Sequence, residues 1–167
     1  TVTTTDFNIA IGNNALQFQT GIGAVAVGYQ AGQDNTADYT TAFGYQALLN
    51  NTSGTENTAV GAFALDACTT SDNNTALGYN ALTAVTTGIG RNTAIGGNAL
   101  RYQTTTTGAT AVGFWAGQDN TADYTTAFGY AALTNNTDGT ENTAVGAFSL
   151  DACTTSDNNT ALGYNAL

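Results

Sequence analysis

The sequence predicts an all-β solenoid, a β-roll of about ten coils with 16–18 residues in each coil. Two observations lead to this prediction. A short motif centred on glycine recurs ten times along the chain, and a larger unit of 85 residues is copied within it. A unit of this length is too short for a pair of helices, and apolar spacing typical of helices is absent. We therefore expect residues 1–167 to form one continuous solenoid segment.

The repeated motif is Ala, an apolar residue, Gly, two variable residues, a small residue and usually Leu. Ala59-Val60-Gly61 and Ala94-Ile95-Gly96 are two examples. Distances between successive glycines are 16, 16, 17, 17, 18, 17, 16, 17 and 17 residues. We expect these ten glycines to be structural: Gly12, Gly28, Gly44, Gly61, Gly78, Gly96, Gly113, Gly129, Gly146 and Gly163.

Within one unit, residues 57–60 and 62–65 flank Gly61 and predict two short strands around a bend. Residues 50–54 and 71–74 are rich in Asn, Asp, Ser and Gly, which is typical of turns. Each unit then forms one coil that hydrogen-bonds to the coils above and below. At roughly 4.8 Å per rung, ten coils would span on the order of 50 Å.

The larger repeat pairs residues 26–82 with residues 111–167 at an offset of 85, with six differences in 57 positions. One of these differences replaces Gln30 by Trp115. Five coils therefore make up one super-repeat. Near-identity of this kind arises when an array lengthens by duplication, and it favours a protein whose role depends on length over one with a unique site.

The motif also predicts which side chains are buried. Neighbouring residues of a strand point to opposite sides, so the Ala and the apolar residue after it face different surfaces. An inward Ala implies a narrow interior, and the outward Val, Ile, Leu or Phe then needs a second surface to cover it. A lone coil would leave this apolar stripe in water, which is an unusually large exposed patch. We therefore expect several chains to associate around an axis.

Composition excludes several functions. The net charge is −10, with Arg91 and Arg101 as the only basic residues, so we expect no binding to nucleic acid or to anionic lipid. No signal peptide and no apolar run of membrane-spanning length is visible, and we interpret the chain as part of a longer protein. Because His and Lys are absent, common acid–base and nucleophile pairings are unavailable, and we expect no enzyme.

The remaining polar candidates also favour structural roles. Asp34 and Asp38, repeated as Asp119 and Asp123, lie in a polar loop, which favours solvated carboxylates over a glycosidase pair. Calcium is the metal that such oxygen-rich loops would bind, but neither the EF-hand spacing nor the glycine-rich nonapeptide is present. We therefore expect turn chemistry and no cofactor.

The two cysteines occupy the same place in the two super-repeats. Cys68 and Cys153 are five coils apart, so rung spacing separates them by roughly 24 Å, which is too far for a disulfide. We expect them to be buried thiols.

Aromatic residues follow the glycines. Tyr or Phe comes directly after Gly in six units, and Phe or Trp comes one residue later in three. We expect these rings to stack along the solenoid as ordinary packing. The functional alternative is a sugar-binding strip in which Trp115, Tyr39 and Tyr124 are exposed platforms for glycan contact.

The sequence resembles the head repeats of trimeric autotransporter adhesins and related repeats in bacteriophage tail fibres. Ala59-Val60-Gly61-x-x-Ala64 and Ala94-Ile95-Gly96-x-x-Ala99 match the core of the family pattern, Asn-Ser-Val-Ala-Ile-Gly-x-x-Ser-x-Ala, and the match recurs along the whole chain. The resemblance implies a homotrimeric left-handed β-roll that lies outside the cell or on a virion and binds surfaces. A single-chain left-handed β-helix is the rival fold, because residues 60–65 fit its hexapeptide pattern once per coil.

The function predicted is therefore a structural or adhesive shaft of an extracellular fibre, from a phage tail fibre or a bacterial surface adhesin. Its expected partners are other copies of itself and cell-surface glycans. One alternative is an extracellular filament whose chains stack end to end without a receptor. A further alternative is an ice-binding solenoid, because Thr precedes the motif Ala in eight of ten units. Ice-binding faces, however, need paired columns of Thr, and here the next outward column consists of Val, Ile, Leu or Phe.

Overall fold

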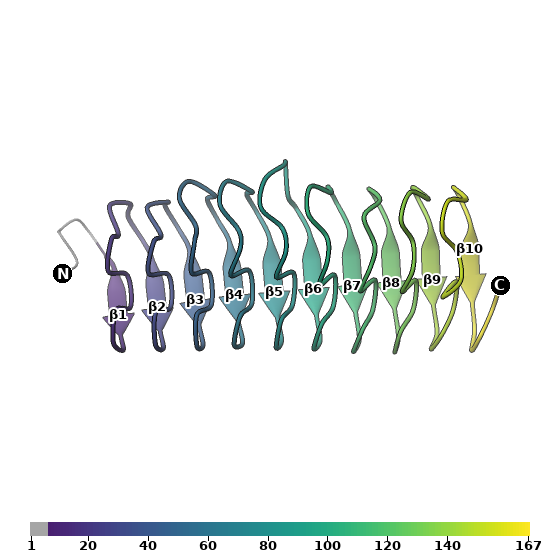
Figure 1. Ribbon diagram of the computed structural model, residues 1–167, viewed down its shortest axis with the longest axis horizontal. Coiled ribbons are helices and arrows are strands. Elements are labelled where there is room, and N and C mark those ends of the chain that lie inside the picture. Colours follow the sequence, from purple (N-terminus) through teal and green to yellow (C-terminus); the bar gives the residue numbers. More distant parts are fainter. Residues whose placement is uncertain (1–6) are drawn as a thin grey trace.

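The computed structural model describes residues 7–167, which wind into a β-solenoid with one strand in each coil (Figure 1). Every strand is three residues long and has the motif Ala at its centre. The strands are β1 (Ile9–Ile11), β2 (Val25–Val27), β3 (Thr41–Phe43), β4 (Thr58–Val60), β5 (Thr75–Leu77), β6 (Thr93–Ile95), β7 (Thr110–Val112), β8 (Thr126–Phe128), β9 (Thr143–Val145) and β10 (Thr160–Leu162).

All ten strands form one parallel sheet, ordered β1 to β10 as in the sequence. The register places like on like: Ala42 pairs with Ala59, and Phe43 pairs with Val60. Because each rung repeats the one before it, every motif position becomes a column along the long axis of the molecule (Figure 1). The predicted all-β solenoid is confirmed, with about 17 residues per turn.

The second predicted strand in each coil is wrong. Residues 62–65 form turns, because Phe63 and Leu65 adopt φ angles of +59° and +51°. Extended backbone requires negative φ, so two left-handed residues in four cannot form a strand. The left-handed conformation costs a Leu on the order of 1–2 kcal/mol, and complete burial of its side chain returns on the order of 1.5–3 kcal/mol. Leu65 is fully buried, so burial offsets the strain.

The backbone at the motif glycines does not suit a side chain, for two reasons that Gly61 illustrates. Its φ is +129°, a backbone conformation that residues with side chains rarely adopt. A Cβ at this position would also lie 2.5 Å from the carbonyl oxygen of Gly78 in the next rung. The ten glycines therefore stack on one another, and their missing side chains allow adjacent coils to approach closely at the bend.

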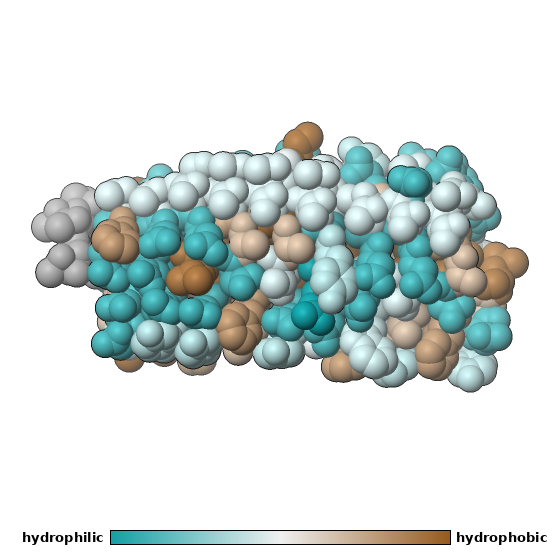
Figure 2. All heavy atoms as spheres, viewed as in Figure 1, coloured by the Kyte–Doolittle hydropathy of each residue, from teal (hydrophilic) through white to brown (hydrophobic). Residues whose placement is uncertain are grey.

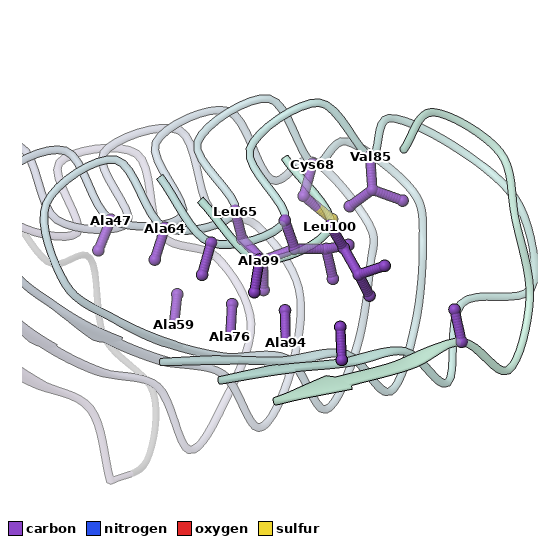
Figure 3. Packing of buried hydrophobic residues seen from close by; sticks show 14 of the residues in the cluster. Ala47, Ala59, Ala64, Leu65, Cys68, Ala76, Val85, Ala94, Ala99 and Leu100 are labelled. Atoms are coloured by element: carbon purple, nitrogen blue, oxygen red, sulfur yellow. The ribbon is translucent and has the colours of Figure 1, made fainter. Parts of the chain in front are cut away.

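The core is a narrow apolar column inside the coil (Figure 3). Ala59, Ala76 and Ala94 project from successive strands, and Ala64 and Leu65 face them from the opposite wall. The motif Ala of every strand from β2 to β10 is 3% exposed or less. The predicted inward direction of this Ala is confirmed, and its small side chain sets the short distance between the two walls.

Candidate functional site

The outer face of the sheet carries two side-chain columns, because the residues on either side of each buried Ala point away from the core. In β4, Thr58 and Val60 are partly exposed while Ala59 is buried. The first column, here called the Thr column, consists of Thr41, Thr58, Thr75, Thr93, Thr110, Thr126, Thr143 and Thr160. The second, the outward apolar column, consists of Ile11, Val27, Phe43, Val60, Leu77, Ile95, Val112, Phe128, Val145 and Leu162.

The outward apolar column is open to solvent in a single chain. Phe43 and Phe128 are each 54% exposed, and Leu77 is 46% exposed. A parallel sheet usually has both of its faces covered, so a row of large apolar side chains on its open face is unusual. Neither column contains a charged residue, so this face can lose its water without burying a charge. It therefore has the composition of an interaction surface.

A row of aromatic rings follows the bend that comes after each strand. Tyr29, Tyr45, Phe63 and Tyr79 form a continuous series with ring centroids 5.2, 5.3 and 6.1 Å apart. These separations are typical of favourable aromatic pairs. The predicted stacking along the solenoid is confirmed; the first contact is parallel and the next two are edge-on.

The aromatic row is interrupted in the sixth coil, where Gly97 and Asn98 stand in place of a ring. A Cβ at Gly97 would lie 3.0 Å from the ring of Phe114, so the next ring covers the glycine. The row then continues through Phe114, Trp115, Tyr130, Phe148 and Tyr164. The molecule thus has two separate aromatic segments, one in each super-repeat.

Trp115 gives the second aromatic segment a different surface from the first. Its indole lies 4.6 Å from the ring of Phe114 and 5.7 Å from that of Tyr130, and the residue is 38% exposed. In the first super-repeat the same place holds Gln30, which accepts a hydrogen bond of 2.7 Å from the side chain of Gln46. A polar amide pair is therefore exchanged for a broad, partly exposed aromatic surface.

Tyr39 and Tyr124 lie beside the N-terminal ends of the strands, whereas Trp115 follows a C-terminal end. Each comes two residues before its strand, whereas Trp115 comes three residues after its own. They are 58% and 60% exposed, and their rings cover Gly23 and Gly108 of the preceding coil. The three predicted glycan-contact residues therefore do not form one continuous strip, although each presents an aromatic ring to solvent.

The acidic loop residues act within the coil stack. The carboxylate of Asp38 accepts the backbone N–H of Ile22 at 2.8 Å, and that of Asp123 accepts the N–H of Thr107 at 2.8 Å. Each bond joins one coil to the coil before it, so these carboxylates tie adjacent loops together. No group of three or more His, Cys, Asp or Glu side chains that could hold a metal ion occurs within residues 7–167.

Buried polar ladders are a feature that the sequence analysis missed. Asn57, Asn74 and Asn92 occupy one interior column, where Asn74 Nδ2 donates to Asn57 Oδ1 and Asn92 Nδ2 donates to Asn74 Oδ1, each at 3.1 Å. Asparagine between short strands indicates turns, and this signal hid the spacing of 17 and 18 residues between the three. The ladder satisfies buried amides from rung to rung and fixes the register.

Cys68 lies in a second interior column, where Asn51 and Asn35 precede it in the two coils before. It is fully buried, and burial raises the pKa of its thiol to about 12. Cys153, the equivalent residue near the C-terminal end, is only partly buried, and both cysteines are free thiols. The predicted burial is therefore confirmed for Cys68 and only partly for Cys153.

A ladder of threonines in the loops between strands, distinct from the Thr column, was also missed. Thr52 Oγ1 donates to the carbonyl of Thr69 at 3.0 Å, and Thr69 Oγ1 donates to the carbonyl of Thr86 at 2.6 Å. The hydroxyls therefore bond along the stack.

On the face shown in Figure 2, hydrophobic side chains occur in small groups among polar and neutral ones.

Taken together, these features define a β-solenoid repeat protein whose distinctive surfaces are the outward apolar column and the two aromatic segments. Among the described residues there is no helix long and apolar enough to cross a membrane. Comparisons with protein-family models, with curated proteins and with solved structures find no match to this chain.

Proposed function

We propose that this chain is a shaft segment of an extracellular fibre, from a phage tail fibre or a bacterial surface adhesin, and that it assembles as a homotrimer. The observation that carries the proposal is the outward apolar column, which is uncharged and extends over all ten rungs. A partner that covers it must present a matching apolar surface of the same length and period. A second copy of the same chain has both properties.

Charge supports the same arrangement. The chain has a net charge of −10, so copies repel one another except where a face is free of carboxylates. The outer face of the sheet is such a face, since neither of its columns contains a charged residue. In the first two rungs, Ile9 and Val25 stand in place of the Thr. Association through this face stabilises a stiff rod without bringing acidic groups together. The number of three chains rests on the resemblance to trimeric adhesin heads.

Attachment is the second part of the proposal. Trp115, Tyr39 and Tyr124 offer exposed rings to the apolar faces of sugars, and three chains would repeat each ring around the fibre. Contacts of this kind are individually weak and gain strength from multiplicity. A Trp115→Gln variant, which copies the first super-repeat, should reduce retention on glycan arrays, while Gln30→Asn should not. Equal retention of the two variants on the glycan arrays would contradict a role of Trp115 in attachment.

The assembly is tested by solution mass, measured by light scattering. The native chain should have a three-chain mass, and the double variant Phe43→Asp, Phe128→Asp should have a one-chain mass because each change places a carboxylate on the outward apolar column. Ile89→Asp is the matched control, since it adds charge at a side chain that is 61% exposed on a loop. A one-chain mass for the native protein would contradict lateral assembly.

An extracellular filament without a receptor is the second candidate function. It is favoured by the parallel stacking of the ten described strands in sequence order, because each rung presents the same backbone pattern to the next. The two candidates differ in direction, because the first places copies side by side and the second places them end to end.

A further inference from the structure

A column of left-handed residues follows the edge of the sheet at which the strands begin, the upper edge in Figure 1. Each member comes two residues before one of the strands β2 to β10, with φ between +54° and +70°. All members except the glycines are exposed. This set, here called the left-handed column, consists of Gly23, Tyr39, Glu56, Asn73 and Arg91, and then repeats as Gly108, Tyr124, Glu141 and Asn158.

The two glycines give the left-handed column two aromatic platforms. A Cβ at Gly108 would lie 2.9 Å from Cδ1 and 3.2 Å from Cε1 of Tyr124, and Gly23 has the same relation to Tyr39. Each tyrosine ring therefore packs against the glycine of the preceding rung. Tyr124 is still 60% exposed, so one side of its ring is open to solvent. A ring that is supported from below and open above can stack against the apolar face of a pyranose.

Arg91 makes the second platform different from the first. It lies two rungs before Tyr124, which is roughly 10 Å along the column, and the ring of Tyr124 covers the rung between them. The position two rungs before Tyr39 holds Phe7, which has no charge. Each platform has a glutamate of the left-handed column one rung after it. The Tyr124 platform is therefore flanked by a cation and a carboxylate, and the Tyr39 platform by a carboxylate alone.

The guanidinium of Arg91 is open to a ligand. The residue is exposed, and the connection between β5 and β6 that carries it rises above the neighbouring loops in Figure 1. The other cation, Arg101, is held within the molecule, because its Cζ lies 4.9 Å from the centre of the Tyr102 ring. Asp123, directly before the platform, accepts the N–H of Thr107 at 2.8 Å. Arg91 is therefore an exposed positive group beside an aromatic platform, in a chain of net charge −10.

We propose that Tyr124 and Arg91 bind a pyranose that carries a carboxylate, the chemistry of a uronic acid residue in a surface glycan. The inference rests on the attachment role proposed above and names the ligand class for one of its rings. The apolar face of the sugar stacks on Tyr124, and the carboxylate lies toward Arg91, whose guanidinium matches two carboxylate oxygens. Glu141, on the other side, repels that carboxylate and accepts hydrogen bonds from sugar hydroxyls, which fixes the orientation.

Arg91→Asn tests the cation. Asn73 occupies the same column with a φ of +58°, so an Asn fits this backbone. Arg101→Asn is the matched control, because it changes the net charge by the same amount at the cation that Tyr102 already holds. Circular dichroism of both variants checks that the solenoid is folded before binding is measured.

Two further variants test the platforms. Tyr124→Asn removes the ring beside the cation, and Tyr39→Asn removes the ring that has no cation nearby. Tyr124→Asn should lose the preference for carboxylated sugars. Tyr39→Asn should keep that preference and lose only part of the binding to neutral sugars.

The readout is the affinity for glucuronate-containing oligosaccharides and for the same oligosaccharides after each carboxylate is reduced to an alcohol. The native chain and Arg101→Asn should bind the carboxylated form about threefold to tenfold more tightly than the reduced form. Arg91→Asn should bind both forms with the affinity that the native chain has for the reduced form. The preference of the native chain should shrink at high salt, because exposed charges are then screened.

Three results would overturn the proposal. Equal affinity of the native chain for the two forms would show that the carboxylate is not recognised, and would leave attachment through neutral sugars standing. An equal loss of preference in Arg91→Asn and Arg101→Asn would assign the preference to net charge. Failure of the native chain to bind either form would contradict both this inference and the attachment role proposed above.

Discussion

Gly61→Ala is the substitution that best separates the two reasons for the motif glycine. The new Cβ would meet the carbonyl oxygen of Gly78 at 2.5 Å and its carbonyl carbon at 2.6 Å, so the two rungs would have to move apart. The φ of +129° adds strain of about 1–3 kcal/mol for a residue with a side chain. Overpacking of this kind adds about 1–3 kcal/mol, which makes a total of about 4 kcal/mol.

Gly163→Ala is the matched control. Its φ is +128°, but no atom lies within 4 Å of the position of its Cβ. This variant therefore carries the backbone strain without the collision. Urea unfolding, followed by circular dichroism and by Trp115 fluorescence, should show a larger loss of stability for Gly61→Ala than for Gly163→Ala. Equal losses would refute the argument that contact between stacked glycines sets the residue type.

Two further predictions concern bonds inside the coil stack. Asp72→Ala should lower the free energy of unfolding by about 1.5–3 kcal/mol in urea melts, because the carboxylate accepts both the N–H and the hydroxyl of Thr55. The control Asp138→Ser, which copies the first super-repeat, should change the free energy of unfolding little. Equal effects of the two variants would contradict this role of Asp72. Burial raises the pKa of Cys68 from 9.0 to about 12, so the thiol loses its proton at a lower pH in the unfolded chain than in the folded one. The free energy of unfolding should therefore fall as pH rises from about 9 to 12. Cys68→Ala should remove that part of the pH dependence, and identical pH profiles for the two proteins would contradict it.

The sequence was sufficient to predict the fold class, the ten-fold repeat and the inward Ala. These features depend on side-chain size and period, which are visible along the chain: an Ala followed by an apolar residue and Gly, as in Ala59-Val60-Gly61, occurs in all ten units. The second strand was predicted wrongly because Phe63 and Leu65 have strand-like side chains, whereas their backbone is left-handed. Nothing in a local pattern reveals that burial compensates for such strain.

The candidate surfaces were predictable in part. The exposed apolar column follows from the alternation of Ala59 and Val60, and the aromatic row follows from the residues after each Gly. The interior ladder through Asn74 was not predicted, because an Asn in a loop and an Asn inside a narrow coil have the same local sequence. Only the winding of the coil shows that residues 17 or 18 apart lie on top of one another.

We propose that the outward apolar column is the buried contact between copies. Its most direct test is the rate at which a maleimide labels single cysteines introduced into the Cys68→Ala, Cys153→Ala background. Val60→Cys lies on the column, and Ser53→Cys lies on an exposed loop as the control. We predict that Val60→Cys is protected in the assembled protein and reacts only after dissociation, while Ser53→Cys reacts at once. Equal labelling rates under native conditions would contradict the claim.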